Sequence, residues 1–260
     1  MLVDTHVHVA LNTLEPVEML LMQMQYNQVE KALLMQHRAS TDNCYLIESM
    51  RRFPGRFSVD CRVDVESAHA LDDLEHWHHA GAEDLRLKDT DRSPGNDPLA
   101  IWRKAQELGM SVNVGAGPAS NYASREFLRI VEELPQLKFI FEHLAGMGLK
   151  ATASRPKSSA AEYSEALKLA RYPNTYIKIH GMSEICSTPF PFTGIPPYIK
   201  MAFDAFGPRR MMWGSDWPLV VRDESYRNAL RFTMEQMTFC SRDDLDWIFG
   251  KTALTIWSFR

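Results

Sequence analysis

The chain has 260 residues, of which 45% are hydrophobic and 24% charged, and its formal net charge is −4. This composition supports one sizeable core and gives no sign of a nucleic-acid or anionic-membrane partner. No apolar run reaches the roughly 20 residues that a membrane span needs. The four cysteines are scattered without a CxxC pair, and the N-terminus lacks a signal-peptide pattern. We therefore expect a cytoplasmic protein with reduced thiols.

Short β-prone runs alternate with amphipathic stretches along the whole chain. Extended segments are predicted at 1–8, 31–36, 57–62, 84–88, 111–115, 138–143, 176–180 and 211–216. Helices are predicted between them, most clearly at 98–108, 124–134, 160–170 and 225–236. Successive strand ends lie 26 to 28 residues apart, and 37 and 36 residues apart at the end. Each interval accommodates one crossover helix between parallel strands.

Eight such units predict an α/β fold of the (β/α)8 TIM-barrel type, with one domain over 1–260. The alternative is an open doubly wound sheet, but no GxGxxG loop follows the first strand. The two longer intervals indicate insertions at 151–160 and 183–197. Both follow strand ends, so we expect them over the barrel mouth as lid or substrate-wall segments. The alternative for each is surface decoration.

Polar residues recur at the predicted C-terminal ends of the strands, which meet at one face of a barrel. They are His6, His8, Gln36, Arg62, Lys88, Asn113, His143, His180 and Asp216. His6 and His8 project to the same side because side chains alternate along a strand. Buried polar groups are costly unless they are paired, so this coincidence favours a functional site. The alternatives are hydrogen-bonded core histidines and, for Asp216, a helix cap.

Four motifs carry a resemblance to a known family. They are DTHVH at 4–8, EHLAG at 142–146, MWGSDWP at 212–218 and IFGKTAL at 248–254. Together they resemble the amidohydrolase-related branch of the amidohydrolase superfamily over essentially the whole chain. Within that branch the chain is most similar to sugar lactonases and 2-pyrone-4,6-dicarboxylate lactonase. Zinc-dependent decarboxylases of aromatic and enol acids are more distant relatives.

The resemblance implies catalytic roles for residues at the barrel mouth. Asp216 matches the base that takes a proton from the attacking water, and His143 matches a histidine that polarises the carbonyl or moves protons. His6 and His8 match a pair that binds a divalent metal in many members. Substrate binding is assigned to a second group of residues, namely Arg62, Lys88, His180, Asn113 and Gln36.

The metal requirement is a separate question, because the fifth predicted strand (111–115) contains no histidine. The ligands that remain are His6, His8 and Asp216. The lactonase subgroup includes members that work without metal. We therefore expect either no cofactor or one divalent metal, zinc before others.

The leading hypothesis is a hydrolase that opens a lactone of a sugar acid or of an aromatic-degradation intermediate. Its ligand would be a small molecule bearing a carboxylate or hydroxyls. The alternatives are a metal-dependent decarboxylase and a non-catalytic binding module.

Overall fold

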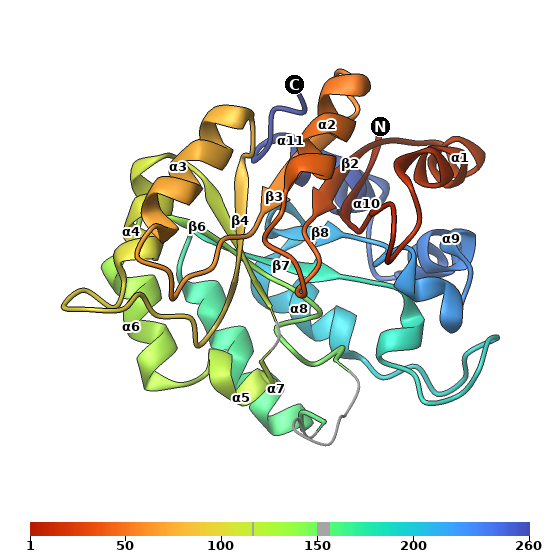
Figure 1. Ribbon diagram of the computed structural model, residues 1–260. Coiled ribbons are helices and arrows are strands. Elements are labelled where there is room, and N and C mark those ends of the chain that lie inside the picture. The colour runs from red at the N-terminus through yellow and green to blue at the C-terminus, as the bar shows by residue number, and fades with distance from the viewer. Residues whose placement is uncertain (116, 150–156) are drawn as a thin grey trace.

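The computed structural model describes residues 1–115, 117–149 and 157–260, and these form a TIM barrel. Eight parallel strands are hydrogen-bonded in the order β1 to β8 (Figure 1). The strands are β1 (Leu2–Val7), β2 (Val29–Met35), β3 (Phe57–Cys61), β4 (Asp84–Lys88), β5 (Ser111–Gly115), β6 (Lys138–Phe141), β7 (Thr175–Ile179) and β8 (Met211–Trp213). The predicted fold class is confirmed.

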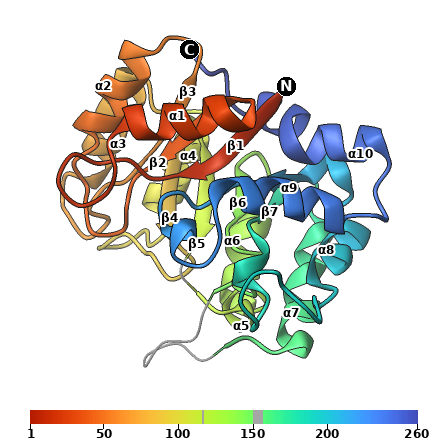
Figure 2. The same cartoon turned by 90° about the vertical axis from the view of Figure 1, so that its right-hand side faces the viewer.

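Helices surround the strands on the outside of the barrel (Figures 1 and 2). They are α1 (Val17–Asn27), α2 (Cys44–Arg52), α3 (Ala70–Ala80), α4 (Ala100–Glu107), α5 (Ala119–Tyr122), α6 (Arg125–Glu133), α7 (Ala160–Ala166), α8 (Tyr198–Phe206), α9 (Tyr226–Gln236), α10 (Arg242–Asp246) and α11 (Thr252–Leu254). Serine side chains cap four of them, since Ser124, Ser159, Ser225 and Ser241 accept hydrogen bonds from the backbone of the first turn. Within the described chain, no helix is both long and apolar enough to cross a lipid bilayer.

The barrel closes where the chain after β8 meets β1. Val7 and Trp217 form a parallel bridge, and the backbone N–H of His8 donates to the carbonyl of Trp217 at 2.8 Å. The backbone N–H of Asp216 donates to the carbonyl of His6 at 2.9 Å. The closure therefore fixes the histidine pair and Asp216 beside one another, although they are 210 residues apart in the sequence.

The barrel interior has an apolar bottom and a polar top. The bottom is filled by Val3, Leu33, Met35, Ile140, Met212, Ala253, Trp257 and Phe259. A second, larger core lies between the strands and the helices. Both chain termini lie at the same end of the barrel (Figures 1 and 2), the end at which β1 begins. The histidines and Asp216 are at the opposite end, where the strands finish, and a further polar group is buried within the barrel at Asp60, Asp84, Asn113 and Lys178.

Several predicted strands extend too far at their C-terminal ends. Six polar residues that were predicted inside strands lie just beyond the ends of the observed strands. They are His8, Gln36, Arg62, His143, His180 and Asp216. The backbone leaves the ladder at these points, and φ is +50° at His143 and +58° at Asp216. Such left-handed backbone is costly for residues other than glycine and is concentrated at functional sites. These polar residues therefore lie within the first three residues of the mouth loops.

Helix predictions are correct to within a few residues, with one difference of type. The predicted helix 160–170 is α7 followed by a 3-10 segment at Leu167–Arg171. Of the predicted insertions, 183–197 lies in the long connection between β7 and α8. The first insertion falls largely outside the described residues, which resume at 157.

Candidate active site

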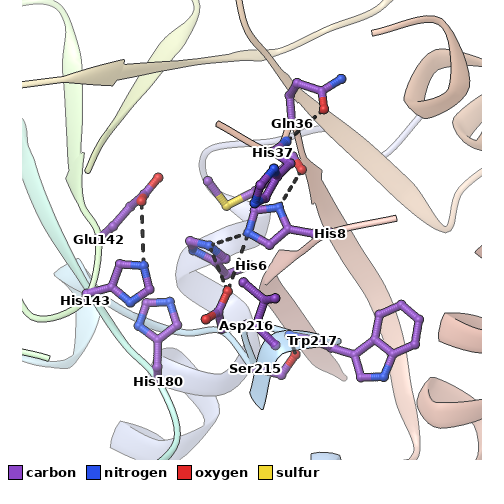
Figure 3. Close-up of polar contacts among 12 residues, drawn as sticks. His6, His8, Gln36, His37, Glu142, His143, His180, Ser215, Asp216 and Trp217 are labelled. Carbon is purple, nitrogen blue, oxygen red and sulfur yellow. Dashed lines mark hydrogen bonds and ion pairs between the residues drawn. The ribbon is translucent and has the colours of Figure 1, made fainter. Parts of the chain in front are cut away.

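The centre of the barrel mouth is formed by two histidines and one carboxylate. The Nε2 atoms of His6 and His8 are 3.2 Å apart, and each lies 3.5 Å from Oδ1 of Asp216. Figure 3 shows the three groups pointing toward one another. Nδ1 of His8 is 2.8 Å from the carbonyl oxygen of Met35, which can only accept, so Nδ1 carries the proton. The Nε2 atom of His8 therefore faces the centre of this group, toward Nε2 of His6 and Oδ1 of Asp216.

This arrangement fits a divalent metal ion. Zinc binds imidazole nitrogen at about 2.0–2.1 Å in a tetrahedron, whose edges are then about 3.3 Å long. The three separations between His6, His8 and Asp216 are 3.2, 3.5 and 3.5 Å, close to one face of that tetrahedron. The same three residues form one of the groups whose ligand atoms converge. His6, His8 and Asp216 could therefore hold a divalent metal ion.

A second pair of imidazoles lies beside the first. The rings of His143 and His180 are stacked, with centroids 4.2 Å apart and planes 14° from parallel. Burial lowers the pKa of each to about 4, although nearby carboxylates raise it. Both rings are therefore neutral at neutral pH, as metal ligands and proton acceptors must be.

Glu184 orients His143. Its Oε1 lies 2.7 Å from Nδ1 of His143, and its Oε2 lies 3.6 Å from Nδ1 of His180. A carboxylate accepts, so Nδ1 of His143 carries the proton and Nε2 is an acceptor. Gly148 makes room for this carboxylate, because a Cβ at Gly148 would lie only 2.4 Å from Oε2 of Glu184.

Asp216 remains ionised in this setting. Burial raises its pKa, but the contact with His8 and the nearby imidazoles His143 and His180 outweigh this and lower the pKa to about 2. The side chain is 18% exposed, toward the mouth. Asp216 is therefore a carboxylate that a water or a substrate can reach.

A buried ion pair completes the wall of the site. Arg86 on β4 donates from Nε and Nη2 to the two carboxylate oxygens of Glu142 at 2.9 and 2.7 Å. Its Nη1 donates to the carbonyl of Gln36 at 3.0 Å. Burial raises the pKa of Glu142, but Arg86 holds it well below the usual range. A Cβ at Gly115 would lie 2.1 Å from Oε2 of Glu142, so this carboxylate needs a glycine beside it.

These groups open into one cavity of about 410 Å³, the main cavity. Its walls include His8, His37, Arg38, Arg86, His143, Glu184, Asp216 and Arg222. The volume falls in the range of sites for small organic molecules. The main cavity thus combines a carboxylate, neutral imidazoles and guanidinium groups in one small-molecule site.

The Amidohydrolase family model matches residues 3–259, nearly the whole chain. The chain belongs to the Amidohydrolase family. Among curated proteins, an L-fucono-1,5-lactonase of Burkholderia ambifaria is 28% identical over 92 residues. That match spans 35% of this chain and only 30% of the relative's length.

Two solved structures share the fold over almost their full length. One, from Pseudomonas putida, is described as a 2-pyrone-4,6-dicarboxylic acid hydrolase; it has a TM-score of 0.78 and 18% identity, covering 100% of this chain and 98% of that chain. The other, an amidohydrolase of Burkholderia multivorans with bound zinc, also has a TM-score of 0.78 and 18% identity, with 99% of each chain covered. At this identity the likeness shows the fold alone.

Among the residues that the sequence indicated, His6, His8, His143, His180 and Asp216 lie together in this amidohydrolase, as described above. The predicted binding residues are more dispersed. Asn113 is buried lower in the barrel, where its amide donates to Asp84. The side-chain amide of Gln36 donates to the backbone carbonyl of Asp42, and the backbone carbonyl of Gln36 accepts a hydrogen bond from Arg86.

Two predicted cations lie at the edge of the main cavity and do not line it. Arg62 is partly buried and donates to the carbonyl of Arg38 at 2.7 Å. The side chain of Lys88 is 52% exposed, and its Nζ lies 3.9 Å from Asp91. Arg86 and Lys88 share one face of β4 because they are two residues apart, and they differ in depth: Arg86 is buried and lines the main cavity, whereas Lys88 ends the strand in an exposed position.

Sequence reasoning missed five charged groups at or beside the main cavity: Arg86, Glu142, Glu184, Arg38 and Arg222. Two of them had a signal, because Arg86 stands between two leucines of β4 and Glu142 directly follows the apolar strand β6. The other three lie in loops or short 3-10 turns, where charged residues are common and a single sequence does not distinguish them. His37, predicted as a loop residue, lies in a loop and also lines the main cavity.

Proposed function

We propose that this amidohydrolase opens a lactone ring by attack of water, acting on a lactone of a sugar acid or of an aromatic-degradation intermediate. The observation that supports this most is the convergence of Asp216, His8 and His143 on the main cavity, with His6 buried beside them. Hydrolysis of a cyclic ester needs a base for water, stabilisation of a developing oxyanion and a proton for the departing ring oxygen. The site contains a group suited to each task.

Asp216 acts as the base in this proposal. Its carboxylate accepts a proton from the water as the water oxygen bonds to the lactone carbonyl carbon. A carboxylate with a pKa of about 2 is a weak base toward bulk water, so acidification of that water would help it. His6, His8 and Asp216 would hold zinc, which when bound lowers the pKa of a coordinated water and polarises a carbonyl.

His143 and Glu184 act on the departing ring oxygen. When the carbonyl–oxygen bond of the ring breaks, the alkoxide must gain the proton that Asp216 took from water. Ligand atoms of His143, Glu184 and Asp216 lie within 4.8 Å of one another, so His143 can relay that proton through Nε2. The carboxylate of Glu184, 2.7 Å from Nδ1, stabilises the imidazolium formed in transit.

Guanidinium groups would bind the rest of the substrate. Among the described residues, Arg86 uses three of its five N–H groups on Glu142 and Gln36, and it still lines the main cavity. Arg38 and Arg222 line the same cavity. Such groups bind a carboxylate or ring hydroxyls by charge-assisted hydrogen bonds.

A panel of substrates tests the proposal. Purified protein is assayed with sugar 1,5-lactones, 1,4-lactones and pyrone carboxylates, with and without zinc, and acid release is followed with a pH indicator. The proposal expects hydrolysis of at least one lactone class. Release of carbon dioxide from aromatic carboxylic acids, without opening of any lactone, would instead support the alternative decarboxylase function.

A further inference from the structure

A second cavity of about 530 Å³ adjoins the main cavity; we name it the distal cavity. Its walls are Lys157, Ser183, Glu184, Cys186, Ser187, Thr188, Pro189, Phe192, Arg222 and Asp223. Four of these residues also line the main cavity: Ser183, Glu184, Arg222 and Asp223. A molecule held over Asp216 therefore has the distal cavity as its immediate neighbour. The catalytic scheme above makes no use of this space.

The wall of the distal cavity is a built structure. Most of it comes from the 183–197 segment, which carries its own aromatic cluster. The rings of Phe190, Phe192 and Phe232 pack edge to face, with centroids 5.6 to 5.9 Å apart. The segment is also tied across itself, because the backbone N–H of Thr193 donates to Oγ1 of Thr188 at 3.0 Å. Such packing and hydrogen bonding hold a wall in place before a ligand arrives.

The base of the same segment is fixed to α9 and its preceding turn. The backbone N–H of Ser183 donates to Oε1 of Glu224 at 2.8 Å. A Cβ at Gly181 would lie 2.1 Å from that oxygen, so the close approach requires glycine. Both ends of the wall are therefore held by specific contacts.

The lining favours a neutral group rich in hydroxyls. Its formal charges balance, with Lys157 and Arg222 against Glu184 and Asp223. A lining with balanced charge offers no net attraction to an anion. A lining this rich in polar groups is also unsuited to an alkyl chain. The serine and threonine hydroxyls both donate and accept, as sugar hydroxyls require, and Phe192 with Pro189 offers a small apolar face for C–H groups.

The main cavity alone has the volume that a single-ring lactone needs. We propose that the distal cavity binds a second sugar ring, so that the preferred substrate is the lactone of a glycosylated aldonic acid. This inference rests on the proposed lactonase function and specifies its substrate class. Ser187 and Thr188 are then residues that determine specificity, with no part in the bond-breaking steps.

Paired substrates test the inference. Glucono-1,5-lactone and cellobiono-1,5-lactone have the same lactone ring, and only the second carries an added glucose. We expect kcat/KM of the wild-type protein to be about tenfold higher for the disaccharide lactone, the gain from a few added hydrogen bonds. Equal values, or a preference for the monosaccharide lactone, would overturn the inference.

A filling variant identifies the cavity responsible. Ser187→Trp places a bulky ring in the distal cavity, and we expect it to remove the tenfold preference while activity on gluconolactone stays unchanged. The matched control is Gln136→Trp, at an exposed position just before β6 on the opposite face of the barrel. If Ser187→Trp lowers both activities equally, or leaves the preference intact, the distal cavity is not the second-ring site.

Binding measurements separate this inference from the proposed function. Calorimetry with gluconate and cellobionate, which need no hydrolysis, measures the contribution of the second ring directly. Absence of lactone turnover with tighter binding of cellobionate, abolished by Ser187→Trp, would contradict the lactonase function and support the second-ring site. Turnover of gluconolactone with equal binding of gluconate and cellobionate would support the lactonase function and contradict the second-ring site.

Discussion

Glu142→Gln is the substitution whose effect on stability follows most directly from the structure. It removes the negative charge that faces Arg86, while both side chains are almost wholly buried, at 0% and 5% exposure. Breaking a buried pair by neutralising one partner costs about 3–5 kcal/mol, because the other charge is left without compensation. Glutamine still accepts one hydrogen bond, and Asp60 lies near enough to raise the pKa of Arg86. We therefore expect the lower end, a loss of about 3 kcal/mol in the free energy of unfolding.

Urea denaturation followed by circular dichroism measures this loss. The matched control is Glu133→Gln on α6, which removes a surface partner of Arg103 at 3.0 Å with both side chains about half exposed. Exposed pairs contribute about 0–1 kcal/mol, so the control should be nearly neutral. A loss below about 1 kcal/mol for Glu142→Gln, or one equal to that of the control, would refute this account of the buried pair.

Three further predictions concern pH, the orienting carboxylate and zinc. Between pH 7 and 5, His143 and His180 each lower stability as pH drops, because their pKa is about 4 in the folded chain against 6.5 in the unfolded chain, so the unfolded state binds the extra protons. Asp4 and Asp84, whose pKa burial raises to about 6 and about 7, act in the opposite direction and are common to both proteins compared. In urea titrations, His180→Gln should therefore gain about 2 kcal/mol relative to the wild-type protein between pH 7 and pH 5. Glu184→Gln should lower kcat about 10- to 100-fold with KM little changed and should shift the pH profile of kcat; an unchanged profile would exclude the orienting role. Zinc at about 100 times its Kd should stabilise the protein by about 2.7 kcal/mol in thermal melts, and His8→Asn should abolish this effect. If zinc stabilises His8→Asn as much as it stabilises the wild-type protein, the zinc binds at another site.

The fold was predictable from the sequence because the spacing of the apolar runs reports directly on crossover length. Each β-prone run and its following helix needs a similar length of chain, so the repeat itself specifies the barrel. The exact ends of the strands were not predictable. At His143 and Asp216 the backbone turns into left-handed conformations, which few residues other than glycine adopt and which no local pattern in the sequence signals.

The site was predictable to the extent that it lies on strands or directly after them. His6, His8, His143, His180 and Asp216 follow from position alone, since strand ends converge. Glu184 could not be placed, because the β7–α8 connection brings it to His143 by a path that carries no periodicity. Lys88 was chosen as the last residue of its strand, although Arg86, two residues earlier, is the one that lines the main cavity.

The central claim is that Asp216 is the base for hydrolysis of a lactone. Its most direct test is kcat/KM of Asp216→Asn on the best lactone of the panel, with Asp204→Asn on the exposed face of α8 as the matched control. The account predicts a loss of about 10³-fold for Asp216→Asn, an unchanged circular dichroism spectrum and full activity in the control. Near-wild-type activity of a folded Asp216→Asn protein would contradict it.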